Sequence, residues 1–189
     1  MKINIFNLIV GFIKNPKEAW ANCKTLDYSP KDIFYNFLLP IILISACIKL
    51  VGRFLNLKDF SVINSSLTFF AFILISISVI FISSWIINKL LPKFKLEKNF
   101  NLVFKIISFA SFPAIIANAL SDLNPFLSFI NFASIYSLVL FWIGSINLLK
   151  IPKEYTTGFI LISLIIIATV LMILNFVTMS VFLSIFFNI

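Results

Sequence analysis

Long apolar segments separated by short polar ones dominate the pattern along this chain. A membrane-spanning helix needs about 20 apolar residues, because the hydrocarbon core of a bilayer is about 30 Å thick. Five such spans are predicted, at about residues 33–50, 67–90, 102–120, 126–149 and 158–187. In the tight turn before the fourth span, Asn124 is placed to cap a helix whose first residue is Pro125. Lys49 and Lys105 fall inside the first and third spans, close enough to the span ends to reach the interface.

The segment before the first span has the pattern of an amphipathic helix that lies in the membrane interface. Its less apolar positions recur every three or four residues, on one narrow face of a helix, at Asn4, Asn7, Gly11 and Lys14. Most other positions are Ile, Phe, Leu or Val, as expected where a helix rests on lipid. The sequence therefore divides into a cytoplasmic amphipathic or interfacial segment, residues 1–32, and a five-span membrane domain, residues 33–189.

Basic residues are distributed very unevenly between the two sides of these spans. Twelve of them lie in the N-terminal segment, around the loop between the second and third spans, or in the loop between the fourth and fifth. The other side has three, Lys49, Arg53 and Lys58. Because cytoplasmic loops carry the excess of Lys and Arg, we expect a multi-pass protein of the cell membrane with a cytoplasmic N-terminus and an extracytoplasmic C-terminus.

Composition agrees with an all-α, polytopic membrane helix bundle and excludes much chemistry. Of 189 residues, 61% are hydrophobic and 12% are charged, against about 25% charged in soluble domains. Histidine is absent and the two cysteines, Cys23 and Cys47, are too few for a structural zinc site. We therefore predict no cofactor, no metal site and no enzymatic activity. The net charge of +8 comes from membrane-flanking lysines and does not indicate nucleic acid; the preference for lysine over arginine suggests a bacterium with AT-rich codons.

A short motif, any residue followed by Pro, Lys and an acidic residue, occurs three times, at residues 15–18, 29–32 and 151–154. In the first two, an Asn or Ser cap, a first-turn proline and an acid are typical of a helix N-terminus. One interpretation is that these motifs only start helices and that their lysines follow the usual positive-inside distribution. The other is a cytoplasmic rim that binds anionic lipid headgroups or a membrane or cytoplasmic protein. The candidate rim residues are Lys14, Lys17, Lys31, Lys93, Lys95 and Lys153.

The third and fourth spans carry small and polar residues that indicate a shared polar face. Its candidate residues are Ser111, Asn118, Ser128 and Asn131. Such side chains can join neighbouring helices by hydrogen bonds, or they can line a polar cavity. Pro40 and Pro113 lie inside spans and are expected to kink them. No carboxylate lies in the middle of a span, so the usual ionisable relay of a coupled transporter is missing.

Several short motifs occur in an order typical of one family. They are Asn15-Pro16-Lys17-Glu18-Ala19-Trp20, then Phe109-Ala110-Ser111-Phe112-Pro113, and finally Tyr136-Ser137-Leu138 and Leu149-Lys150-Ile151-Pro152-Lys153-Glu154. With five spans around them, the chain resembles the Yip-domain family in its bacterial form. The resemblance implies a five-helix membrane domain with a cytoplasmic N-terminus, and it transfers no function residue by residue.

Two functions follow as hypotheses. The first is a non-enzymatic membrane scaffold or a protein that interacts with partners or lipids through its cytoplasmic rim. The second is a small solute transporter, or a transporter subunit, that uses the polar stripe between the third and fourth spans.

Overall fold

The computed structural model describes residues 5–25, 28–55 and 61–187, with the backbone alone for residues 5, 25, 125 and 182–187. Throughout this part of the chain every regular element is helical, which confirms the predicted all-α class. Lys58, part of the charge argument above, lies outside the described residues.

The elements follow one another with few connecting residues. Two helices, α1 (Ile5–Lys14) and α2 (Pro16–Thr25), precede a continuous helical stretch of α3 (Pro30–Ile33), the π-helix η1 (Phe34–Leu38) and α4 (Leu39–Leu55). Next come α5 (Val62–Leu90), the 3₁₀ helix η3 (Leu91–Phe94) and α6 (Phe100–Ser121). The 3₁₀ helix η4 (Pro125–Ser134) then continues into α7 (Ile135–Leu149), and α8 (Lys153–Phe187) ends the described chain.

Five helices are long and apolar enough to cross a membrane, as predicted. They are Pro30–Leu55, Val62–Phe94, Phe100–Ser121, Phe126–Leu149 and Lys153–Val181. The first continues past the predicted end because Lys49 forms an ion pair with Asp122 and so does not interrupt the helix. The second begins five residues early, at Val62, where the Ser61 side chain accepts from the backbone N–H of Asn64.

Helix-start signals in the sequence are confirmed. Ser29 and Asp32 form the capping box expected before the first span. Asn124 accepts a hydrogen bond from Phe126 N at 2.9 Å, although the helix that it caps is 3₁₀ and not α. These signals depend on residues three or fewer positions apart, which is why sequence alone identifies them.

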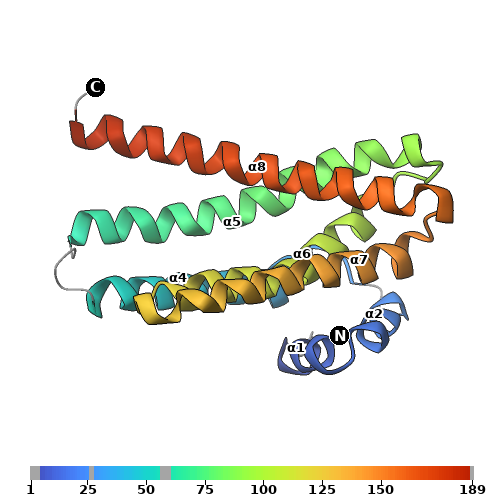
Figure 1. Ribbon diagram of the computed structural model, residues 1–189, viewed down its shortest axis with the longest axis horizontal. Coiled ribbons are helices and arrows are strands. Elements are labelled where there is room, and N and C mark those ends of the chain that lie inside the picture. Colours follow the sequence, from blue (N-terminus) through green and yellow to red (C-terminus); the bar gives the residue numbers. More distant parts are fainter. Residues whose placement is uncertain (1–4, 26–27, 56–60, 188–189) are drawn as a thin grey trace.

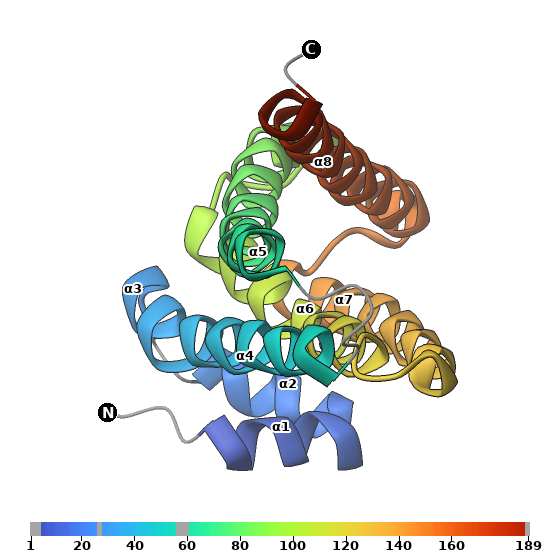
Figure 2. The same cartoon turned by 90° about the vertical axis from the view of Figure 1, so that its left-hand side faces the viewer.

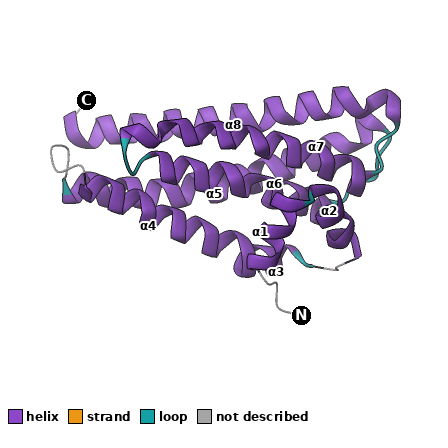
Figure 3. Ribbon diagram, turned by 60° about the horizontal axis from the view of Figure 1, so that its bottom comes forward, coloured by secondary structure: helices purple, strands orange, loops and turns teal. Residues whose placement is uncertain are grey.

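The spans form two layers, with the first two helices beneath them (Figures 1 and 2). One layer holds α4, α6 and α7, and the other holds α5 and α8. Helix α6 is the central element, with 61% of its most apolar window buried, and the fourth span is the least covered, at 11%. Helices α1 and α2 lie against the first layer, beside α6 and α7 (Figure 3).

The two prolines inside spans have different consequences. Pro40 has no N–H and its ring would crowd the carbonyl of Asn36 in a regular α-helix. The preceding turn widens to a π-helix, in which the N–H of Leu39 reaches back to the carbonyl of Phe34. Pro113 lies inside α6 without ending it. Both spans therefore continue through their prolines.

Candidate functional site

One end of the bundle carries several exposed lysines, and we call it the basic end. It comprises η3, the first turn of α6, the last turn of α7 and the first turn of α8. Lys93, Lys95 and Lys153 lie together at this corner, because the ring of Phe94 packs against Tyr155 and Phe159 at centroid distances of 6.3 and 5.3 Å. The Lys95 ammonium lies 5.3 Å from the Tyr155 ring centroid, over its face.

The other predicted rim lysines lie elsewhere. Lys14 ends α1, Lys17 belongs to the first turn of α2, and Lys31 belongs to the first turn of α3. All six rim lysines are exposed. The structure thus divides the predicted rim into the η3–α8 corner, the α1–α2 turn and the start of the first span.

Two lysines at the basic end have a backbone conformation that normally favours glycine. Lys95 has φ 60° and Lys150 has φ 51°, and they form the C-terminal caps of η3 and α7. A left-handed residue with a Cβ costs roughly 1–2 kcal/mol, which glycine avoids. Lysine at these caps brings a positive charge to the negative end of a helix dipole, and both residues are exposed.

The N-terminal hairpin, which we define as α1 and α2, packs directly against the spans. Trp20 is fully buried, and its ring lies 4.9 Å from that of Phe12 and 6.1 Å from that of Phe109. The indole also covers Gly144 of α7, where an added Cβ would lie 2.6 Å from a ring carbon. Glycine at 144 is therefore what allows the tryptophan to reach the backbone of α7.

Two side chains of the spans bind the ends of the hairpin helices. The hydroxyl of Tyr136 donates to the carbonyl of Phe12 at 2.7 Å, and the ammonium of Lys105 donates to the carbonyl of Cys23 at 3.4 Å. Both carbonyls belong to the last turn of a helix, where no intrahelical N–H remains to pair with them. The spans therefore cap both hairpin helices.

Lys105 does not reach the interface, so that expectation is wrong. The residue is 5% exposed, beneath the hairpin. Its charge is stabilised there by the carbonyl at the C-terminal end of α2 and by that helix dipole. Nothing near Lys105 in the sequence indicates this partner, because Cys23 lies 82 positions earlier.

Burial also determines the chemistry of Cys23. Loss of solvent raises the pKa of its thiol from 9.0 to about 12, and the nearby Lys105 charge opposes that rise only in part. The thiol is therefore protonated and unreactive near neutral pH while the hairpin is docked. Burial raises the pKa of Tyr28 as well, with a smaller contribution from Cys23.

The predicted polar face of the third and fourth spans is not gathered around one space. The Ser111 hydroxyl donates to the Ile107 carbonyl of its own helix, and Asn118 accepts from Lys49 Nζ at 2.8 Å. Ser128 and Asn131 are exposed on the outside of η4. The carrier interpretation depended on these residues sharing a cavity, and this arrangement gives it no support.

A different serine joins the third and fourth spans. The N–H of Ala114, next to Pro113, donates to the Ser137 hydroxyl of α7 at 3.0 Å. This bond crosses from α6 to α7 at the residue after the proline, where the regular α-helical pattern is disturbed. Polar residues thus connect these two spans, as one of the two interpretations expected.

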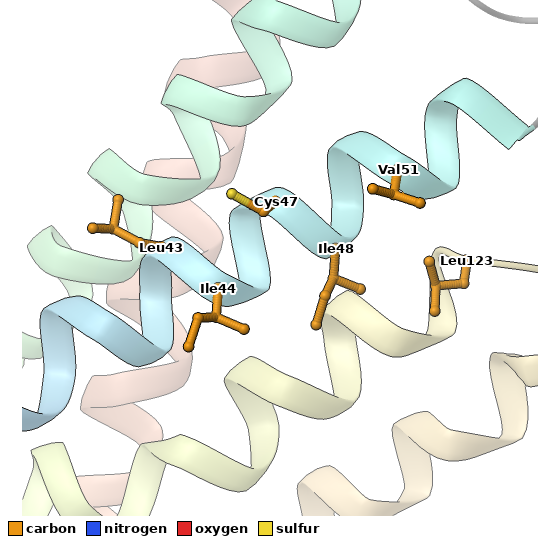
Figure 4. Close-up of a pocket in the computed structure, with 6 residues that line it drawn as sticks. All are labelled: Leu43, Ile44, Cys47, Ile48, Val51 and Leu123. Carbon is orange, nitrogen blue, oxygen red and sulfur yellow. The ribbon is translucent and has the colours of Figure 1, made fainter.

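At the opposite end of the bundle, Lys49 joins three spans. It forms an ion pair with Asp122, donates to Asn118 and lies 5.0 Å from the Phe72 ring centroid. Beside it, a groove on α4 has an entirely apolar lining (Figure 4): Leu43, Ile44, Cys47, Ile48, Val51 and Leu123. Within the described ranges, no three His, Cys, Asp or Glu side chains are grouped to hold a metal ion.

The arrangement is that of a multi-pass membrane protein with a docked N-terminal hairpin and an exposed basic end. No curated protein and no solved structure matches the chain. The family model of the Yip1 domain matches residues 10–186, which include the second half of α1, α2 and all five spans. The chain therefore belongs to the Yip1 domain family.

Proposed function

We propose that this Yip1-family protein is a non-enzymatic scaffold of the cell membrane whose basic end faces the cytoplasm and binds anionic lipid headgroups. The observation that carries the proposal is the pair of left-handed lysines, Lys95 and Lys150. At both positions a glycine would relieve backbone strain, and the lysine supplies a charge at the bundle end instead.

The surroundings of these lysines support the same function. Lys93, Lys98 and Lys153 are exposed near them, and the carboxylates of that corner are Glu97 and Glu154. The corner thus keeps a positive excess. A lysine near an anionic membrane surface contributes about 1 kcal/mol. The ring cluster around Phe94 and Tyr155 holds the η3 turn against α8, so the charges are presented from a fixed backbone.

The orientation belongs to the proposal and has its own test. With the basic end in the cytoplasm, the N-terminus is cytoplasmic and the C-terminus is extracytoplasmic. Alkaline phosphatase fused to the C-terminus should then be active, because it folds only outside the cytoplasm. A fluorescent protein at the same position that lights up inside the cell would contradict the orientation.

Headgroup binding is tested on the purified protein in neutral detergent by native mass spectrometry with phosphatidylglycerol and phosphatidylcholine. We expect a preference for phosphatidylglycerol that falls about tenfold or more when Lys95, Lys150 and Lys153 are all replaced by Gln. Replacement of the three by Arg should keep the preference. Arg53→Gln removes one charge at the other end and should leave it unchanged.

Two results would overturn the proposed lipid site. One is equal binding of the two lipids by the unaltered protein. The other is a preference that survives the triple Gln substitution. If the basic end instead binds a cytoplasmic protein and does not distinguish the two lipids, the rim lysines belong to a protein-binding site.

A further inference from the structure

The first half of the fourth span has two uncovered faces. In the 3₁₀ helix η4, side chains three residues apart lie above one another. Phe126, Phe129 and Phe132 form one such row, at 87, 64 and 75% exposed. Ser128 and Asn131, both exposed, form the next row. The third row, which includes Leu127 and Ile130, is half-buried where η4 runs along α6.

Asn131 differs from three other asparagines of the spans, Asn118, Asn147 and Asn175. Asn118 accepts from Lys49, and the side-chain amides of Asn147 and Asn175 donate to carbonyls one turn back in their own helices. The exposed Asn131 side chain has no hydrogen bond to any residue that the structure describes. Its amide therefore offers both a donor and an acceptor to the outside of the bundle.

Depth makes this exposure costly. Asn131 lies six residues after Pro125, so with a 3₁₀ rise of about 2.0 Å per residue it is about 12 Å from the start of η4. For a span that enters the hydrocarbon core at the start of η4, that depth is inside a core about 30 Å thick. A polar side chain with lipid as its only neighbour lacks hydrogen-bond partners, and helices in membranes satisfy such groups across an interface.

We propose that the Phe126–Phe129–Phe132 row and Asn131 form the contact between two copies of this chain. An amide is self-complementary, since its NH₂ can donate to the carbonyl oxygen of an identical amide. A two-fold axis beside η4 brings the two Asn131 side chains together and satisfies both at once. The same axis covers the phenylalanine rows of both copies with protein.

A second copy is the partner that this face fits, because an identical amide at the same depth satisfies both the donor and the acceptor of Asn131. A two-fold contact supplies that amide automatically, with the same flanking aromatic row. The proposal uses the lateral surface of the fourth span and not the lysines of the basic end. If headgroup binding fails, the dimer proposal still stands. If the dimer contact fails, the headgroup proposal still stands.

Cross-linking in membranes tests the contact in a Cys47→Ala background, which leaves the buried Cys23 as the native thiol. Ser128→Cys should give a covalent dimer with a short bis-maleimide. The matched control is Ser66→Cys, the same substitution at an exposed residue of α5 that lies four residues and so about 6 Å from the start of its helix, about as far as Ser128 lies from the start of η4. It should remain monomeric.

The role of the amide is measured by photobleaching-step counting of labelled protein in phosphatidylglycerol–phosphatidylcholine vesicles at several protein-to-lipid ratios. Asn131→Leu should raise the dissociation constant about 5- to 30-fold, and Asn131→Gln should keep most of the affinity. A Cys23 that stays unreactive to maleimide will show that each variant retains its fold. Equal cross-linking at positions 128 and 66, an unchanged dissociation constant in Asn131→Leu, or capture of a different protein would overturn the proposal.

Discussion

A single methyl group at Gly144 should loosen the N-terminal hairpin. In Gly144→Ala the new Cβ would lie 2.6, 2.7 and 2.9 Å from three carbons of the Trp20 ring. Because that ring is fully buried between Phe12, Phe109 and α7, it has little room to retreat. Overpacking of this kind costs about 1–3 kcal/mol, and the cost falls on the docked state of the hairpin.

The buried thiol of Cys23 reports undocking directly. It is 0% exposed while α2 is docked, so maleimide reacts with it only after the hairpin leaves the bundle. In a Cys47→Ala background, a docking loss of about 1–3 kcal/mol raises the labelling rate about 5- to 150-fold, at tenfold for each 1.4 kcal/mol. The rate is followed by the mass of the intact protein in detergent and in vesicles.

Gly158 provides the matched control. A Cβ there meets only a ring carbon of Phe94, at 3.9 Å, which is ordinary contact. Gly158→Ala should therefore label at the parent rate. Trp20→Ala should label faster still, since loss of a buried tryptophan costs about 3–5 kcal/mol. The Gly144→Ala/Trp20→Ala pair should be no worse than Trp20→Ala alone, because the clash no longer exists. Parent-like labelling of Gly144→Ala, or additive effects in the pair, would refute the contact.

Three further changes test other parts of the bundle. Ser137→Ala leaves the N–H of Ala114 without its acceptor and should destabilise the protein by about 0.6–2 kcal/mol, seen as a lower Tm in detergent. Gly52→Ala places a Cβ 2.5 Å from the carbonyl oxygen of Asp122, a backbone atom that cannot rotate away, so a larger loss of Tm is expected. Above pH about 9 the unfolded thiol of Cys23 releases its proton while the folded one, with a pKa of about 12, keeps it. The free energy of unfolding should therefore fall by up to about 1.4 kcal/mol for each unit of rising pH. The fall is measured relative to Cys23→Ala, which lacks this thiol.

The features that sequence alone predicts here are those set by nearby residues or by lipid. Span number follows from runs of apolar residues, and the Ser29–Asp32 and Asn124 caps follow from residues two or three positions apart. The first span shows where this reasoning fails. The sequence predicts an end at about Leu50, with Lys49 close to the interface. In the structure Asp122, 73 positions later, pairs with that lysine, and α4 runs to Leu55.

The contact between Trp20 and Gly144 cannot be predicted from nearby residues either, because its two partners are far apart in the sequence. Trp20 and Gly144 are 124 positions apart, and neither residue shows in its own segment that the other faces it. One indirect signal was present. Lys105 lies within the apolar sequence of the third span, and a charged residue there needs a partner. The interface or a buried acceptor can meet that need, and in the structure the acceptor is the carbonyl of Cys23.

Lys105 and the lysines at the basic end lie in two different environments in this bundle. Each left-handed lysine, Lys95 and Lys150, keeps its ammonium outside the bundle at the cost of a strained backbone. Lys105 keeps its ammonium inside, against the end of α2, where the hairpin covers it. An undocked hairpin would expose that ammonium to lipid without its acceptor, so the charge itself favours the docked state. The hairpin therefore packs as a structural part of the membrane domain, and the exposed lysines of the basic end are the ones to which the proposed function assigns headgroup binding.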